Sequence, residues 1–536
     1  MRDTRFIILL LVVTVFLYFF GRGTMALTDP DETFYAQSAK EMLNAGEWVT
    51  PLIFGEPQFE KPAFYYWLVM ASYMVFGVNE FAARFPSALF GIAGVIGVYF
   101  LGRLLFSRRC GLLSGLVLAT CVQYIVLARG CVTDMVLSVF ILYCLLFFLA
   151  GWMTGRGPYF LVSAVMAALA VLTKGPIGLF IPGVVILLYM LFSGQWRNLR
   201  NIPVGWCILV FLAVSLPWYI AISRAHGAAF IDDFFLFRNI TRFLEPEHEC
   251  SASPFFYVPV FIMGFFPWSL FLPLGAWNIY RGKGDGPGLK GWKMFLLVWF
   301  LAVFVFFSVS RTKLVTYILP LYPVAAVLVG RFWEKFIYGE DVKGVLARHM
   351  NISYAVFSMT SIFGLVGVFF LVRFKYPQAL TGAVVAETVF AAGLALSLLF
   401  FIFNRKRAAF FSIVLSVVLL CVPLVRYVLP VIEEFETTKA LSLTFRELSA
   451  PGEPLGGETD SRRGIAFYSG RTEVVDIHPY PALKGFISRK ERVWGIVQHK
   501  HYEQLKGEVG NAVSEPVSRS GDNVLITNKP LAEREK

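Results

Sequence analysis

Three carboxylates stand close together near the start of the chain, in the stretch TDPDETFY (residues 28–35) that follows a long apolar run. Such groups can take a proton from a hydroxyl or orient a polar substrate. A helix start explains part of the cluster, with Asp29 as the N-cap, Pro30 in the first helical position and Glu32 closing a capping box. Asp31 is left over, although a first-turn acid also gains stabilisation from the helix dipole. We therefore take Asp31 as the leading candidate for a catalytic acid, with Glu32 beside it.

A fourth acid, Asp134, lies in the stretch RGCVTDM at the edge of another apolar segment. It can serve simply as a helix cap. However, an ionisable group at the edge of a membrane segment is a functional candidate by default. Asp134 is therefore a second candidate catalytic residue.

Several cations are suited to binding phosphate oxygens, which Arg and Lys both do. They are Lys61, Lys174, Arg242, Arg311 and Lys313, and Tyr317 follows closely after the last two. A purely structural role is also compatible with each cation. Lys61 can form a weak surface ion pair with Glu60, the arginines can pair with acids such as Asp232 and Asp233, and Lys174 can be a snorkelling membrane anchor.

The elements that position these residues are apolar helices. Of the 536 residues, 57% are hydrophobic and only 16% are charged, against roughly a quarter charged in soluble proteins. Apolar runs near 20 residues long match the thickness of a bilayer, whereas a membrane barrel would show short alternating segments. The sequence therefore predicts an α-helical polytopic membrane protein with about thirteen transmembrane helices between residues 6 and 429, beginning with an uncleaved first span.

Charge distribution predicts the orientation of these spans. Short loops rich in Arg and Lys are expected on the cytoplasmic side. The opposite loops hold most of the carboxylates, including Asp31 and Asp134, together with the phosphate-binding candidates. The first of these outer loops contains two expected interfacial helices, at residues 31–44 and at residues 62–76, the second with an aromatic FYYW sequence typical of the headgroup layer.

Hydrophobicity falls from about residue 431. Strand-like runs at 464–468, 473–477, 493–497 and 523–527 alternate with polar helix-like stretches. We expect two parts: a transmembrane domain at 1–430 and a soluble C-terminal α/β domain at 431–536. An odd number of spans places the second on the periplasmic side.

The sequence gives no support for a nucleic-acid-binding protein, a disulfide framework or a dedicated metal site. The net charge of +12 is explained by basic loops facing anionic lipid headgroups, so no nucleic acid partner is expected. The seven cysteines show no disulfide or zinc spacing. The six histidines show no metal-binding spacing either, and Glu60 with a histidine of the second outer loop is the one candidate pair of metal ligands. The cofactor is left unknown, with no divalent metal predicted from spacing.

Together these motifs resemble the GT-C superfamily of polyprenyl-phosphate-sugar glycosyltransferases. Within it the chain is most similar to the bacterial lipid A aminoarabinose transferase (ArnT) group, which is related to protein O-mannosyltransferases. The resemblance rests on an ordered series of motifs: PDETFYA (30–36), GEWVTP (46–51), FEKPAFYYW (59–67), Asp134, TKG (173–175), ITRF (240–243), PFFYVPV (254–260) and KLVTYILP (313–320).

The resemblance implies that Asp31 and Asp134 are the catalytic acids. It also implies that Lys61, Arg242 and Tyr317 hold the carrier phosphate. The chain departs from the family pattern in EKPA for EKPP, in VTYILP for PTYILP, and in Asn239 for a histidine near ITRF. The last change puts a metal site shared with Glu60 in doubt.

The implied protein is a monomeric glycosyltransferase of the bacterial inner membrane, with its active site on the periplasmic side. It would move a sugar from an undecaprenyl-phosphate donor to lipid A or another envelope glycan, by inverting displacement. Two alternatives stay open, a protein O-mannosyltransferase-like enzyme acting on Ser and Thr hydroxyls, and a polyprenyl-lipid transporter or flippase. A transporter would be expected to show internal repeats and charges deep within its spans.

Overall fold

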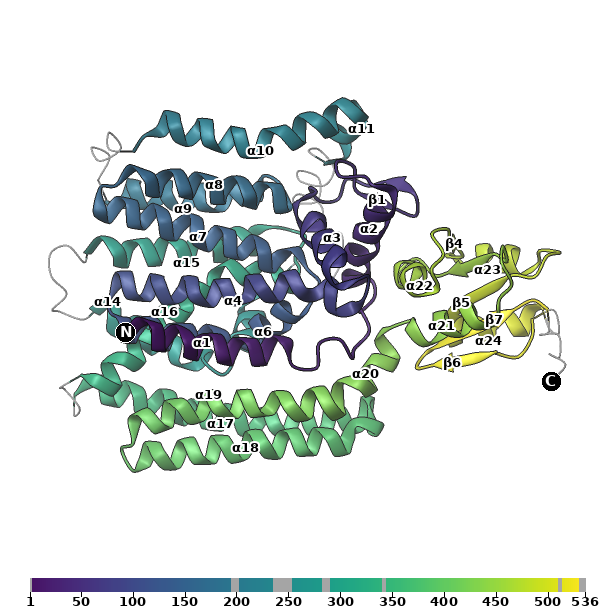
Figure 1. Cartoon of the computed structure of the whole chain (residues 1–536). Helices are drawn as coiled ribbons and strands as arrows, with labels where there is room; N and C mark the ends of the chain where they lie inside the picture. The colour runs from purple at the N-terminus through teal and green to yellow at the C-terminus, as the bar shows by residue number, and fades with distance from the viewer. Residues whose placement is uncertain are drawn as a thin grey trace.

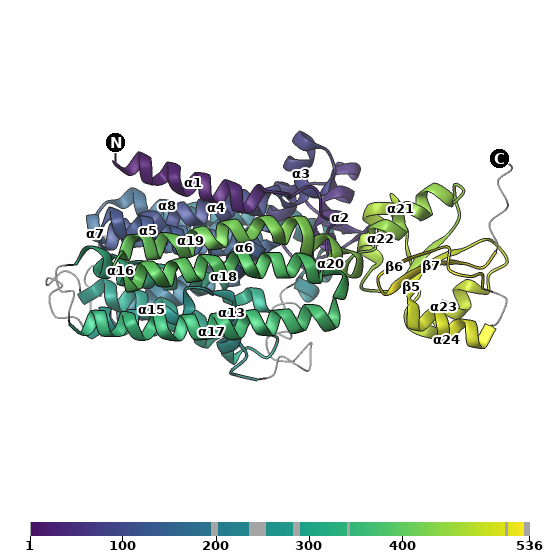
Figure 2. The ribbon, with the colours of Figure 1, turned by 90° about the horizontal axis from the view of Figure 1, so that it is seen from below.

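The computed structural model describes residues 2–193, 202–234, 253–281, 290–339, 344–509 and 513–529. It is an elongated bundle of roughly aligned helices with a small mixed domain at one end (Figures 1 and 2). The helices of the first loop, α2 (Asp31–Ala45) and α3 (Phe64–Phe76), lie at the bundle end that faces this domain. Arg242 and the ITRF motif lie outside the described residues.

Within the described residues, nine helical segments are long and apolar enough to cross a membrane. They are α4 (Glu80–Leu105), α7 (Thr133–Thr154), α8 (Gly157–Lys174), α10 (Val204–His226), α15 (Lys290–Val309), η6 with α16 (Val315–Leu321 and Tyr322–Tyr338), α17 (Val345–Lys375), η7 with α18 (Pro377–Ala379 and Leu380–Ile402), and α19 continued by η8 and α20 (Lys406–Pro423, Leu424–Val428 and Leu429–Glu436).

Two bent helix pairs are further candidate spans. The pair α5 (Arg108–Ala119) and α6 (Val122–Arg129) bends by 67°, and α13 (Tyr257–Gly264) bends by 109° against η4 (Ser269–Phe271) and α14 (Leu272–Arg281). The remaining predicted spans correspond to the shorter helices α1 (Arg2–Phe19) and α9 (Ile177–Ser193). Each predicted span thus coincides with a helix or a bent pair, which confirms the polytopic helical class. The number of crossings stays a prediction.

The first loop is folded tightly against the bundle. Between α2 and α3 the chain makes a short antiparallel hairpin of β1 (Leu52–Ile53) and β2 (Glu56–Pro57). The expected aromatic belt on α3 is only partly correct, because Tyr65 and Tyr66 are fully buried. The helix packs against α2, α4 and α8, so these two rings fill the protein interior instead of facing headgroups.

The C-terminal domain has a five-stranded sheet in the order β4-β3-β5-β7-β6. Its strands are β3 (Leu455–Gly457), β4 (Val475–Asp476), β5 (Trp494–Gln498), β6 (Ser518–Ser520) and β7 (Asn523–Thr527). Strand β3 pairs in parallel with both β4 and β5, and β7 pairs antiparallel with β5 and β6. The expected α/β class of this domain is confirmed.

Helices cover both faces of the sheet. One core contains residues of α21 (Lys439–Leu448) and α22 (Arg462–Ser469), and another contains residues of α23 (Tyr480–Ile487) and α24 (His499–Val509). The strand expected at 464–468 is wrong, because these residues lie in α22. A run of five apolar residues fits a buried helix turn as well as a strand, and here Gly470, at φ +76°, ends it as a helix.

Candidate active site

The first turn of α2 sends its three carboxylates to three different places. The predicted cap is wrong, since Pro30 takes the N-cap position and no described side chain caps the helix. Asp29 accepts hydrogen bonds from the hydroxyls of Thr33 at 2.7 Å and Thr438 at 3.1 Å. Glu32 points into the protein, and Asp31 is exposed. The three acids therefore do not act as one cluster.

Glu32 is held in a buried ion pair with Arg84. Its Oε2 lies 2.5 Å from Nη2 of Arg84, and its Oε1 accepts from Nε of Arg84 at 2.8 Å and from the Cys131 backbone at 2.7 Å. The backbone of Thr28 donates to Oε2 at 3.0 Å. Both oxygens are thus engaged inside the scaffold. The expectation that Glu32 serves as a catalytic acid is therefore corrected to a structural role.

Asp31 faces a group of charges from distant parts of the chain. Burial by surrounding atoms raises the pKa of Asp31, and the nearby carboxylate of Asp134 raises it further, whereas Arg463 lowers it. Glu32 and Glu60 also act to raise it. The structure therefore places Asp31 near Asp134, as the resemblance implies, and adds Glu60 and, from the C-terminal domain, Arg463. An acid with a raised pKa is suited to proton transfer nearer neutral pH.

Asp134 pairs with Lys174 beneath this group. Asp134 is buried in the first turn of α7, and its Oδ1 lies 2.5 Å from Nζ of Lys174 at the last residue of α8. Nζ of Lys174 also lies 4.5 Å from the ring centroid of Tyr317 in η6. Asp134 caps no helix among the described residues, because Val132 is the N-cap. Three predicted site residues on three separate helices therefore meet here, and Lys174 is not a simple membrane anchor.

The other phosphate-binding candidates among the described residues occupy loops. Nζ of Lys61 donates to the carbonyl oxygen of Glu60 at 3.0 Å. Lys313 is buried, its ammonium donates to the carbonyl oxygen of Ser310, and burial lowers the pKa of Lys313. Arg311 is exposed. Within the described residues, no group of three or more His, Cys, Asp or Glu is placed to hold a metal ion.

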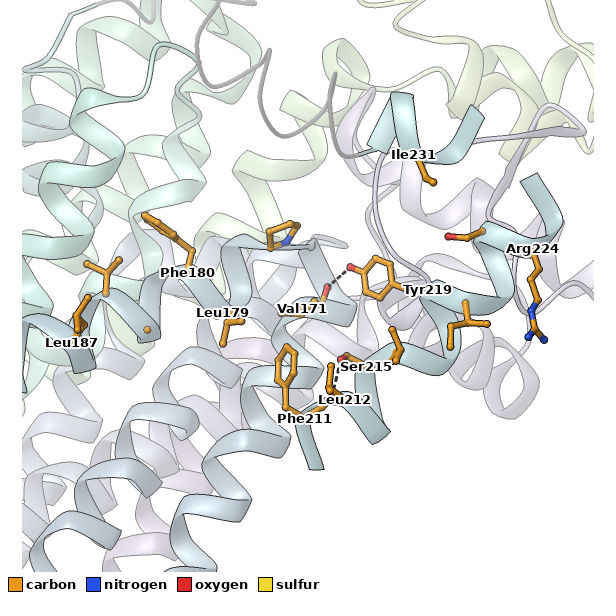
Figure 3. A pocket seen from close by; sticks show the side chains of 16 residues that line it. Val171, Leu179, Phe180, Leu187, Phe211, Leu212, Ser215, Tyr219, Arg224 and Ile231 are labelled. Carbon is orange, nitrogen blue, oxygen red and sulfur yellow. Dashed lines mark hydrogen bonds between the residues drawn. The ribbon is translucent and has the colours of Figure 1, made fainter. Parts of the chain in front are cut away.

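Two apolar grooves flank α9. The larger has a volume of about 1080 Å³ and lies between α8, α9 and α10, where Val171, Phe180, Phe211 and Tyr219 line it (Figure 3). It reaches Pro176, two residues after Lys174. The smaller, of about 340 Å³, lies between α9 and α15. The polar candidate site at the end of the bundle therefore adjoins the larger groove, whose apolar lining is suited to a hydrocarbon chain.

The fold agrees with that of a known enzyme over its whole length. The structure of ArnT from Cupriavidus metallidurans bound to undecaprenyl phosphate superposes with a TM-score of 0.80 at 22% sequence identity, covering 99% of this chain and 100% of that one. The chain has an ArnT-like fold. An archaeal oligosaccharyltransferase, AglB from Archaeoglobus fulgidus, is a more distant structural neighbour, with a TM-score of 0.54, 14% identity and coverage of 96% and 69%.

Sequence comparisons agree with this ArnT-like fold. Residues 60–220 match the family model described as dolichyl-phosphate-mannose-protein mannosyltransferase. The undecaprenyl phosphate-alpha-4-amino-4-deoxy-L-arabinose arabinosyl transferase of Enterobacter sp. (strain 638) is 29% identical, over 62% of this chain and 60% of its own length. An uncharacterized protein of Aquifex aeolicus is 32% identical, over 61% and 63%. The match thus spans somewhat less than two thirds of the length of these relatives.

Sequence reasoning missed two residues of this candidate site. Arg84 stands at the start of the second predicted span, and its position at the edge of an apolar segment was a usable signal. Arg463 carried no signal, because it belongs to a polar region that only the fold brings beside α2.

Proposed function

We propose that this chain is an integral-membrane glycosyltransferase that moves a sugar from an undecaprenyl-phosphate donor to lipid A or another envelope glycan. The observation that carries the proposal is the meeting of Asp31, Asp134, Lys174 and Tyr317 at one end of the bundle, next to two apolar grooves. The Enterobacter relative named as an undecaprenyl phosphate-aminoarabinose transferase supports the choice of donor and sugar class.

The cations and the acids of the site have different roles in the proposed reaction. A sugar on a polyprenyl phosphate carries its own leaving group, so the protein has to stabilise the negative charge that grows on that phosphate. Lys174, with the predicted Lys61, Arg242, Arg311 and Lys313, supplies cations for this purpose. Direct displacement by the acceptor inverts the anomeric centre. Asp31 accepts the proton of a hydroxyl acceptor, or orients an acceptor that is already anionic.

The grooves favour a lipid acceptor. A donor lipid needs one apolar path beside the site, and a second lipid substrate needs another. The two grooves on either side of α9 meet this requirement. A Ser or Thr side chain of a protein acceptor would need only one. We therefore place lipid A, or another envelope glycolipid, ahead of a protein as the acceptor.

A protein O-mannosyltransferase-like activity is the second candidate, and the family model matched by residues 60–220 favours it. A lipid flippase is the third. It is less well supported, because the described charges gather at the bundle end instead of deep within the spans. We further propose a monomer in the bacterial inner membrane, with the site and the C-terminal domain, residues 431–536, on the periplasmic side.

Two substitutions test the function. Asp31→Asn and Lys61→Ala should each abolish sugar transfer in membranes supplied with the undecaprenyl-phosphate-linked donor, with expression unchanged. Glu56→Gln, an exposed acid of the same loop, is the matched control and should keep full activity. Mass spectrometry of lipid A and of envelope glycans identifies the product. Full transfer by Asp31→Asn would refute its catalytic role, and full transfer by Lys61→Ala would refute its phosphate role.

A further inference from the structure

The C-terminal domain docks onto α2 through one short helix, α22. The backbone N–H of Gly464 donates to the carboxylate of Asp29. The hydroxyl of Tyr468 accepts from the backbone of Leu27 at 2.7 Å, and Nζ of Lys40 donates to the carbonyl oxygen of Phe467 at 2.9 Å. These contacts join α22 to α2 and to the segment just before it, and the two helices pack against each other (Figure 1).

Gly464 sets how closely the two helices approach. A Cβ atom at this position would lie 2.3 Å from Oδ1 of Asp29 and 2.5 Å from Oδ2. Only glycine therefore allows the backbone of α22 to rest on that carboxylate without a shift. The next residue toward the N-terminus is Arg463, whose placement follows directly from this contact.

Arg463 lies beside the candidate catalytic acid. Its guanidinium carbon is 4.7 Å from the ring centroid of Phe34. Phe34 and Asp31 are three residues apart, and side chains at this spacing share one face of a helix. In agreement with this geometry, Arg463 acts to lower the pKa of Asp31, against burial and the carboxylate of Asp134, which raise it. The side chain of Arg463 is half-buried.

Arg463 differs from its neighbour Arg462 in what its guanidinium contacts. Within the described part of the chain the guanidinium of Arg463 makes no ion pair and no side-chain hydrogen bond. Arg462, in contrast, donates to the carbonyl oxygen of Val474 at 2.7 Å and pairs with Asp476 at 3.2 Å. The hydrogen bonds and the ion pair of Arg462 thus lie within its own domain, whereas the guanidinium of Arg463 lies over the ring of Phe34 on α2.

We propose that Arg463 is a residue of the active site, delivered by the C-terminal domain, which binds an anionic group of the acceptor next to Asp31. The inference rests on the proposed function and adds a role for the domain. Lys174 and Arg463 lie on different elements around the acids, so one cation serves the donor phosphate and the other serves the acceptor. Because the two acids repel any anion that approaches, an acceptor carrying phosphate or carboxylate groups requires such a cation.

Kinetics of the full-length protein in membranes test the role. With lipid A as the acceptor, Arg463→Gln should raise the KM for the acceptor by roughly tenfold, the order expected for losing one charge partner, and leave the KM for the donor unchanged. Arg463→Lys should restore part of the loss. Arg489→Gln is the matched control, since Arg489 lies 4.9 Å from the Phe486 ring in the same domain. An acceptor KM unchanged in Arg463→Gln would overturn the proposal.

A separate variant tests whether docking of the C-terminal domain positions Arg463. Gly464→Ala keeps the guanidinium but adds the Cβ that meets Asp29, so it should reproduce the defect of Arg463→Gln. Normal acceptor kinetics in Gly464→Ala would show that docking does not position Arg463.

A measurement that does not depend on sugar transfer tests the role of Arg463 separately from the proposed function. Carbodiimide labels protonated carboxyl groups, and mass spectrometry across a pH series gives the midpoint for Asp31. Besides Arg463, the charged groups of the described chain that act most strongly on Asp31 are Asp134, Glu32 and Glu60. Arg463→Gln should move the midpoint to higher pH, and Arg489→Gln should not. If the labelling midpoint of Asp31 does not move in Arg463→Gln, the proposed role of Arg463 is wrong. If the midpoint moves but the wild-type protein transfers no sugar, only the glycosyltransferase assignment is refuted.

Discussion

The ion pair between Glu32 and Arg84 is expected to stabilise the folded protein and to take no part in catalysis. Arg84 donates twice to Glu32, and it also donates to the carbonyl oxygens of Met25 at 2.7 Å and Ala26 at 2.6 Å. Although burial raises the pKa of Glu32, Arg84 and the backbone donors outweigh it, so the net pKa is lowered and the acid stays ionised. The pair therefore ties α2 and α4 to the segment that follows α1.

The perturbation is Glu32→Gln, which keeps the shape of the side chain and removes its charge. Arg84 is then left as a buried cation, with side-chain exposure of only 7%, without its counterion. Removing one partner of a buried ion pair costs about 3–5 kcal/mol. Thr28 and Cys131 each donate a backbone hydrogen bond to one carboxylate oxygen, so one of these two donors then faces the amide NH2 of Gln. At about 2–4 °C per kcal/mol for a large domain, the midpoint of thermal unfolding should fall by roughly 10 °C.

The assay is the loss of the monodisperse peak in detergent after heating, measured together with sugar transfer per folded molecule. The second variant is Glu32→Gln with Arg84→Met, which removes both charges and should recover part of the stability. Transfer per folded molecule should stay within about twofold of the wild type, because no transition-state contact is lost. A Glu32→Gln protein with normal thermal stability and no transfer would refute the structural role and restore Glu32 as a catalytic acid.

Two further predictions concern the groove and the docking of the domain. Gly183 lines the larger groove with open space around its position, so Gly183→Trp should fill the groove and raise the KM for a lipid substrate severalfold. Gly364→Trp, at an equally open position on α17, is the control and should leave this KM unchanged. Equal kinetics of the two variants would refute the role of the groove in lipid binding. Burial raises the pKa of Asp29 from 3.8 to about 7. The docked state therefore binds a proton more tightly than an undocked one, and docking should weaken as pH rises from about 4 to about 7. Hydrogen exchange of the backbone amides at 464–468 measures the docking of α22, and Asp29→Asn should remove its dependence on pH. Docking that is equally pH-dependent in Asp29→Asn would show that Asp29 is not the titrating group.

The helical architecture could be predicted in some detail because its signals are local. A run of apolar residues must satisfy its own backbone in lipid, so its length and limits mark a helix wherever it lies in the chain. The helices expected at 31–44 and 62–76 are also present, as α2 and α3. Local patterns were less reliable where they had to compete with tertiary contacts. The cap at Asp29 and the strand at 464–468 both failed because burial against another element decided the outcome.

The membrane class, the α/β class of the C-terminal domain and most of the candidate acids and cations follow from the amino-acid sequence, since residue type limits what chemistry a side chain can perform. Which of these residues meet depends on the tertiary fold. Lys174 reaches Asp134 from 40 residues away, and Glu32 reaches Arg84 across 52. Arg463 comes to Asp31 from a separate domain. Such pairings depend on how helices pack, and packing is set by side-chain complementarity between segments that no local pattern records.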